Sequence, residues 1–308
     1  MKKPLYKIVY ILLALSVSAI WGFGFIAVDH AVEKGLGEWA LVSVRFLAAA
    51  LAILPVRAAF KKAGKAGKFQ RKDVLWGAVV GAVNFFGFLF QTMAMTGSGK
   101  TDTARCALFT SAYVVLVSVA SCFLQKKFSL KSVFYALLFF VGMMILNNPF
   151  KGGALVRGDF FAILCSLFFA AQILLVGKAK GVDFLNFNIV QMATMGLLGG
   201  VGALFTDWKT LAALKEGSVL LCILYLTLFS SAYAYIVQII VQKKLSDSLS
   251  AILLSLEAVA SVLFSLIFGR VGFSYPLLFG GGIMVVATVL ASAAESNKEE
   301  KGEKEEKE

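Results

Sequence analysis

Long apolar runs alternate with short polar segments along the chain. Most runs have about 17 to 23 residues, the length that an α-helix needs to cross ~30 Å of hydrocarbon. Unpaired backbone N–H and C=O groups are costly in lipid, so each run is predicted to be a helix. The fold class is therefore an all-α polytopic membrane protein. Ten membrane-spanning helices are predicted, at residues 8–28, 39–56, 74–95, 103–124, 130–146, 160–176, 184–205, 219–241, 249–268 and 275–294.

The loops between the runs carry most of the charge, and its distribution predicts the orientation. If both ends of the chain and every second loop are cytoplasmic, the cytoplasmic side without the tail holds 17 Lys and Arg residues. Cytoplasmic loops are usually enriched in these residues, so both termini are predicted to be cytoplasmic. With this orientation the outer loops hold only 7 further Lys and Arg residues, namely Lys34, Lys100, Lys151, Arg157, Lys209, Lys215 and Arg270.

The composition indicates a protein of the inner or plasma membrane. Hydrophobic residues make up 59% of the chain and the mean hydropathy is +0.83, which is above the range of soluble domains. The net charge is +12, and the charged residues lie between the apolar runs. Lipid head groups rather than nucleic acid are therefore their expected partner. The four cysteines lie apart and His30 is the single histidine, so neither a metal site nor a cofactor is predicted.

The stretch at 94–101, AMTGSGKT, is similar in its letters to a phosphate-binding loop. Such a loop needs a buried strand before it and a helix after it. Here an apolar run of membrane-spanning length precedes the loop, which is predicted to face outward. We therefore predict no nucleotide site at 94–101. Gly97 and Gly99 instead indicate a tight turn, with Thr101 or Asp102 capping the following helix.

The chain is weakly similar to itself when it is shifted by about half its length. An offset of 147 residues places Gln91 on Gln238, and an offset of 146 places Ser111 on Glu257. Five helices per repeat would invert the second copy in the membrane, an arrangement common in transporters. The charged, low-complexity tail is predicted to be disordered. The predicted units are a first repeat at 1–150, a second repeat at 151–294 and the tail at 295–308.

Three short motifs occur in order along the chain: Trp21-Gly22, Arg45-Phe46-Leu47 and Leu256-Glu257-Ala258-Val259. Together they resemble the EamA family of the drug/metabolite transporter superfamily. The resemblance extends over residues 8–294. It implies ten helices in two EamA repeats with cytoplasmic ends, in a protein that moves small metabolites, often by exporting them.

The sequence departs from the family pattern at two pairs of positions. Gln125-Lys126 and Gly269-Arg270 stand where the family usually has Gly-Glu. Ala112 and Ala258 stand where the family often has proline. Because proline kinks helices, the fourth and ninth helices are predicted to be straighter than in the family.

Glu257 is the acidic residue that lies deepest in an apolar run. Ser250, Ser261 and Ser265 lie on the same helical face. A charged group at this depth is costly, so its carboxyl group is expected to face the interior of the helix bundle. Two roles remain open for Glu257. It is either a protonatable group or counter-charge on the translocation path, or a glutamate that joins two helices through serine hydrogen bonds.

Two arginines also lie inside apolar runs. Arg45 either binds a carboxylate or phosphate of the substrate, pairs with Glu257, or extends its side chain to the outer interface. Arg105 lies only two residues into its run, so it is predicted to extend to the interface.

The eighth run carries a polar stripe at helical spacing. The stripe consists of Thr227, Ser231, Tyr235, Gln238 and Gln242. The third run has Asn84 and Gln91 at the equivalent place. Such amides and hydroxyls predict a cavity that binds a polar metabolite, with hydrogen bonding between helices as the alternative. The candidate substrate-binding and translocation residues are Trp21, Arg45, Asn84, Gln91, Ser111, Gln172, Gln191, Ser231, Tyr235, Gln238, Glu257 and Ser261.

These features predict a secondary transporter that works by alternating access through a central polar cavity. The family resemblance implies amino acids or related compounds as substrates and export as the direction. Coupling to protons through Glu257 is one hypothesis, and passive facilitation is another. The remaining alternatives are a drug or cation exporter of the same superfamily and a non-transporting scaffold or sensor. No enzyme is predicted, because only one acidic residue lies deep, and the protein is expected to be a monomer or a homodimer.

Overall fold

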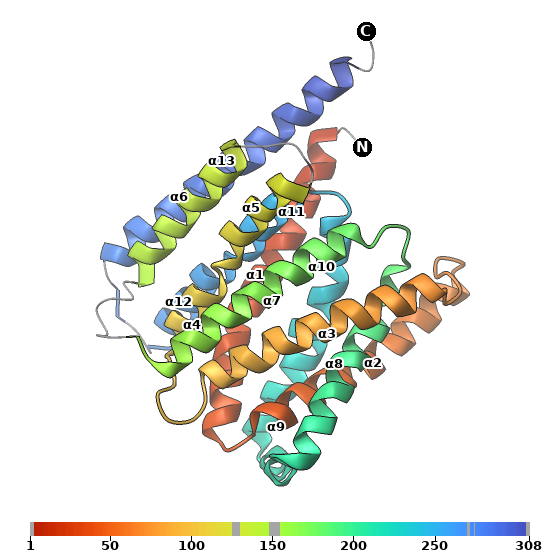
Figure 1. The fold of residues 1–308 in the computed structure, drawn as a ribbon, viewed down its shortest axis with the longest axis vertical. Coiled ribbons are helices and arrows are strands. Elements are labelled where there is room, and N and C mark those ends of the chain that lie inside the picture. The colour runs from red at the N-terminus through yellow and green to blue at the C-terminus, as the bar shows by residue number, and fades with distance from the viewer. Residues whose placement is uncertain (1–2, 125–129, 148–154, 270–271, 274, 306–308) are drawn as a thin grey trace.

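The computed structural model describes residues 3–124, 130–147, 155–269, 272–273 and 275–305, and regular structure in these ranges is helical (Figure 1). The first half contains α1 Lys3–Glu33, α2 Glu38–Lys62, α3 Arg71–Ala94, α4 Thr103–Thr110, α5 Tyr113–Leu124 and α6 Leu130–Asn147. The second half contains α7 Arg157–Lys178, α8 Phe184–Phe205, η2 Trp208–Lys215, α9 Gly217–Tyr225, η3 Leu226–Tyr233, α10 Ala234–Gln242, α11 Asp247–Leu254, α12 Glu257–Ile267 and α13 Tyr275–Glu305.

Within the described ranges, eight helical stretches are long and apolar enough to cross a membrane. Two further apolar helices, Leu130–Leu146 and Leu278–Ala294, are shorter. Large apolar side chains such as Leu51, Leu75 and Phe205 are exposed on the outside of the bundle, as is expected of a surface that contacts lipid. The chain is therefore an all-helical polytopic membrane protein.

The helices of the two halves of the chain interleave instead of forming two separate bundles. The most extensive contacts join α2 to α8, α6 to α13, α3 to α8, α3 to α7 and α1 to α12 (Figure 1). Each of these pairs joins a helix of the first half to a helix of the second. Both described ends of the chain lie at the same end of the bundle, where α1 begins and α13 ends (Figure 1).

The expected straightness of the fourth and ninth helices is wrong. The fourth stretch is interrupted between α4 and α5 at Ser111-Ala112, and the ninth between α11 and α12 at Ser255-Leu256. At the second interruption, the Ser255 hydroxyl donates to the Ala251 carbonyl at 2.7 Å. Such back-bonding by serine bends helices without proline. Gln125-Lys126 and Arg270, the other departures from the family pattern, lie outside the described residues.

Small residues bring the two halves into close contact. A Cβ atom added at Gly77 or Gly81 of α3 would overlap atoms of α8, including the carbonyl oxygens of Phe187 and Gln191. Glycines at such positions let helix backbones approach closely. The prediction for the loop before α4 is also confirmed. Gly97 has a positive φ of 70°, and Asp102 caps α4 by accepting from two backbone N–H groups.

The structure differs from the prediction in the tail. α13 ends at Glu305, so the helix continues through most of the segment predicted to be disordered from residue 295. The sequence there is rich in Glu and Lys, which have high intrinsic helix propensity. Residues 306–308 lie outside the described part of the chain.

The Gly158→Ala variant is expected to be less stable than the wild type by about 1–3 kcal/mol. The added Cβ atom would overlap the backbone oxygen of Ala94 and the backbone nitrogen of Thr101, neither of which can rotate away. Thermal unfolding of the purified protein measures the change. Gly282→Ala is the matched control, because no atom lies within 4 Å of its added Cβ. Equal stability of the two variants would contradict the close contact at Gly158.

Candidate functional site

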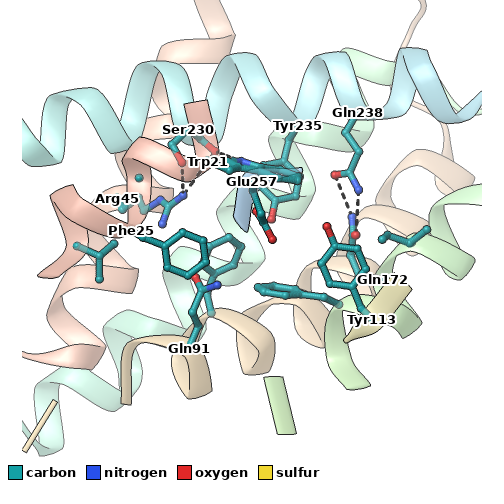
Figure 2. Close-up of a pocket in the computed structure, with 15 residues that line it drawn as sticks. Trp21, Phe25, Arg45, Gln91, Tyr113, Gln172, Ser230, Tyr235, Gln238 and Glu257 are labelled. Atoms are coloured by element: carbon teal, nitrogen blue, oxygen red, sulfur yellow. Dashed lines mark hydrogen bonds between the residues drawn. The ribbon is translucent and has the colours of Figure 1, made fainter. Parts of the chain in front are cut away.

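A cavity lies inside the bundle, and side chains from both halves of the chain line it (Figure 2). The volume of the cavity that the centres of water molecules can reach is about 40 Å³. At 10–15 Å³ per molecule, this is room for about three waters, so the cavity in this conformation accepts only a small molecule. Seven of the candidate residues line it, namely Trp21, Arg45, Gln91, Gln172, Tyr235, Gln238 and Glu257.

Arg45 of α2 is buried, with 2% of its surface exposed, and its side chain is directed into the bundle. Its Nε donates to the Ser231 hydroxyl at 2.8 Å, and its Nη2 donates to the hydroxyl and the carbonyl oxygen of Ser230 at 2.9 and 3.4 Å. The guanidinium group also lies over the rings of Phe46 and Phe88. Extension of Arg45 to the outer interface is therefore excluded. All of these partners are neutral, so the positive charge is not paired with an acidic group of the described chain.

Glu257 is the first residue of α12 and lines the same cavity. It is 5% exposed, and it lies in a helix turn where the helix dipole favours a negative charge. The hydroxyl of Tyr113 lies close enough to interact electrostatically with the Glu257 carboxyl group. The hydroxyls of Ser250 and Ser261 have no hydrogen-bond partner in the described structure. These two serines therefore do not join Glu257 to a neighbouring helix.

Arg45 and Glu257 line one cavity without forming an ion pair with each other. Lys34–Glu216, Lys100–Glu33 and Arg105–Asp159 form ion pairs, and none of them involves Arg45 or Glu257. The cavity thus contains a buried basic and a buried acidic side chain, and neither forms an ion pair with a described residue. The same residue ranges contain no group of three or more His, Cys, Asp or Glu residues placed to hold a metal ion.

The segment η3 is a π-helix, and it carries the residues that hold Arg45. The backbone hydrogen bonds of a π-helix span five residues instead of four, and such segments are frequent at functional sites. The carbonyl oxygen of Ser230 accepts from Trp21 Nε1 at 2.9 Å as well as from Arg45. The polar stripe predicted for the eighth helix is therefore divided by a change of helix type before Tyr235.

A pair of amides lines the end of the cavity opposite Arg45 (Figure 2). Gln238 Nε2 donates to Gln172 Oε1 at 3.1 Å, and Gln172 Nε2 donates to Gln238 Oε1 at 3.3 Å. One turn further along α10, Gln242 Nε2 donates to the carbonyl oxygen of Ile173 at 2.9 Å. These bonds join α10 to α7 near the ends of both helices at Gln242 and Lys178.

The other five candidate residues do not line the cavity. Two of them support residues that do: Asn84 donates to the Tyr235 hydroxyl at 2.8 Å, and Ser231 accepts from Arg45. The remaining three are Ser111, Gln191 and Ser261, which are buried away from the cavity surface. Gln191 lies in the interface between α3 and α8 beside Gly81.

Two polar residues of the cavity, Tyr113 and Ser230, were not predicted from the sequence. Tyr113 is the first residue of α5, so its place depends on the break after α4. Ser230 is off the stripe at α-helical spacing and turns toward Arg45 in the π-helical segment. The apolar part of the cavity surface includes Phe25, Phe88 and Phe169.

The prediction that Arg105 extends to the interface is wrong. Arg105 is 9% exposed, and its Nη2 donates to Asp159 at the start of α7. Asp159 also accepts from the Thr101 hydroxyl at 2.7 Å and from the Val156 backbone N–H at 2.9 Å. Arg105 is therefore a structural residue that joins α4 to α7.

The comparisons with known proteins identify the class to which this membrane-spanning bundle belongs, that of membrane transporters. The model of the EamA-like transporter family matches residues 8–148 and 156–293. A protein of Archaeoglobus fulgidus described as an uncharacterized transporter is 30% identical over 280 residues, which are 90% of this chain and 83% of that protein. The chain therefore belongs to the EamA-like transporter family.

A solved structure described as "Crystal structure of protein" has the same fold. It superposes with a TM-score of 0.74 and covers 94% of this chain and 98% of its own, at 17% sequence identity. At this identity the likeness shows the fold alone. The family and the A. fulgidus relative indicate a transporter rather than an enzyme.

Proposed function

We propose that this chain is a secondary transporter that exports small zwitterionic metabolites, with amino acids as the leading class. It works by alternating access through the cavity between the two halves. Ten helices cross the plasma membrane in two inverted five-helix repeats, residues 1–150 and 151–294, with both termini in the cytoplasm. The surplus of Lys and Arg on one side of the membrane and the two breaks at Ser111-Ala112 and Ser255-Leu256 support this arrangement.

One observation carries the proposed substrate class. Arg45 and Glu257 are buried in one cavity, and no described side chain neutralises either of them. A buried charge without a counter-charge is costly, and charge-assisted hydrogen bonds are the strong ones. A zwitterion supplies a carboxylate for Arg45 and an ammonium group for Glu257. Gln91 and Tyr113 supply further hydrogen-bonding groups at the cavity surface.

Thermal unfolding of the purified protein in the presence of matched ligands tests the proposed function. Alanine is compared with propionate, which lacks the ammonium group, and with ethylamine, which lacks the carboxylate. A ligand that binds only the folded protein adds about 2.7 kcal/mol at 100 times its Kd. We expect alanine or a close relative to stabilise the protein far more than either single-charge analogue, because only the zwitterion compensates both charged groups.

Two variants make this experiment specific to the cavity. Arg45→Ala is expected to remove the stabilisation by ligand. Thr288→Ala is the matched control, since Thr288 is buried in α13 and its hydroxyl bonds only to the Met284 carbonyl within its own helix. Equal shifts with propionate and alanine, or a full shift in Arg45→Ala, would contradict the proposed substrate class. Sugars, nucleosides and ATP complete the panel, and a shift with one of these alone would replace the proposal.

A further inference from the structure

The π-helical segment η3 contacts two of the first-half helices that line the cavity, α1 and α2. Its Ser230 binds Arg45 of α2 through the hydroxyl and Trp21 of α1 through the carbonyl oxygen. The contact with α1 is close, because a Cβ atom added at Gly24 would lie 3.2 Å from the Ser230 hydroxyl oxygen. The segment is thus held at one point by two side chains from the other half of the protein.

The same segment continues directly into α10, a helix that lines the cavity. η3 ends at Tyr233 and α10 begins at Ala234, without a loop between them. α10 carries Tyr235, which lines the cavity, and Gln238, which bonds to Gln172 of α7. The orientation of Gln238 therefore depends on the helix type of the residues before it.

A change of helix type in η3 would rotate α10 about its axis. An α-helix has 3.6 residues per turn, so a shift of the helix by one residue rotates all later side chains about the helix axis by roughly 100°. A rotation of this size would separate the amides of Gln238 and Gln172. The single turns of π-helix found in proteins cluster at functional sites, which fits a segment with two arrangements.

We propose that η3 transmits the state of Arg45 to the amide pair that closes the cavity, with Ser230 as the positioning residue. This inference rests on the proposed function, in which a substrate carboxylate binds Arg45. The carboxylate competes with the Ser230 hydroxyl for the guanidinium group. When Arg45 turns from Ser230 to the substrate, η3 loses the contact that holds its π-helical form, and α10 rotates. The Gln172–Gln238 pair then opens on the side at which α7 ends.

A labelling experiment without substrate tests this link. Ile173 lies beside the amide pair and lines the cavity, so Ile173→Cys provides a reporter in a chain whose four native cysteines are replaced by alanine. In inside-out vesicles, a membrane-impermeant maleimide reaches this cysteine only when the amide pair is open. Ser230→Ala removes a hydrogen bond to a charged group, so we expect the labelling rate to rise about tenfold. Ser230→Thr retains the hydroxyl and is expected to restore the slow rate.

Two further variants separate the proposed link from general loosening of the bundle. Ser166→Ala removes a serine that is 1% exposed on α7 and bonds within its own helix, and labelling is expected to remain slow. Gln172→Ala opens the pair directly and sets the upper limit of the rate. A slow rate in Ser230→Ala, or equally fast rates in the Ser230→Ala, Ser230→Thr and Ser166→Ala variants, would overturn the inference. No ligand is present in these comparisons, so their outcome is independent of whether amino acids are the substrate.

Discussion

Replacement of Asp159 by alanine is expected to lower the stability of the folded protein by about 3–5 kcal/mol, the cost of breaking a buried ion pair by removing one partner. Asp159 is completely buried and accepts hydrogen bonds from Arg105, Thr101 and the Val156 backbone. Without its carboxylate, Arg105 remains 9% exposed with an uncompensated positive charge. The apparent midpoint of thermal unfolding in detergent measures the loss.

A second variant distinguishes the ion pair from the other bonds of Asp159. In Arg105→Leu/Asp159→Asn, both charges are absent, while the asparagine oxygen in the place of Oδ2 still accepts from the Val156 backbone N–H, and the amide nitrogen in the place of Oδ1 donates to the Thr101 hydroxyl oxygen. Removing both charges of a buried pair is often close to neutral, so this double variant is expected to recover most of the lost stability. If Asp159→Ala lowered stability by less than about 1 kcal/mol, Asp159 and Arg105 would behave as an exposed pair.

The position of the helices was predictable because the lipid constrains them strongly. The apolar run at 130–146 coincides with the helix Leu130–Leu146, since a run of this kind has few alternatives in lipid. The interruptions at Ser111-Ala112 and Ser255-Leu256 were not predicted, because proline was taken as the signal for a kink. At the second of them, Ser255 bonds to its own helix, which produces the same bend, and the direction of its hydroxyl cannot be derived from the sequence.

The cavity was partly predictable for a similar reason. Polar and charged residues inside apolar runs are costly, so Arg45, Gln238 and Glu257 could be assigned to the bundle interior from the sequence alone. Position along one helix, however, does not show what lies on the next. Arg105 was assigned to the interface by its depth, whereas its partner Asp159 lies 54 residues away on α7. Ser230 was missed because the assumed α-helical spacing directs it away from the stripe.

Glu257→Gln is expected to reduce substrate binding by about tenfold or more, because it removes a charge-assisted hydrogen bond to the substrate inside the bundle. The ionised carboxylate is the form that binds an ammonium group. In the wild type, binding and flux are therefore expected to strengthen as the pH rises and Glu257 loses its proton. The glutamine side chain has nearly the same shape and does not titrate, so the variant is expected to fold normally and to lose this pH dependence.

The other groups that face the cavity determine how this profile is interpreted. Arg45, Tyr113 and Tyr235 are the remaining titratable side chains at the cavity surface, and all three keep their protons at neutral pH. A pH dependence that is lost in Glu257→Gln therefore belongs to Glu257. Flux into proteoliposomes between about pH 5 and 8, compared for wild type, Glu257→Gln and Glu257→Asp, measures it. Glu257→Asp keeps the charge and should retain a pH dependence, whereas an unchanged profile in Glu257→Gln would remove Glu257 from the translocation path.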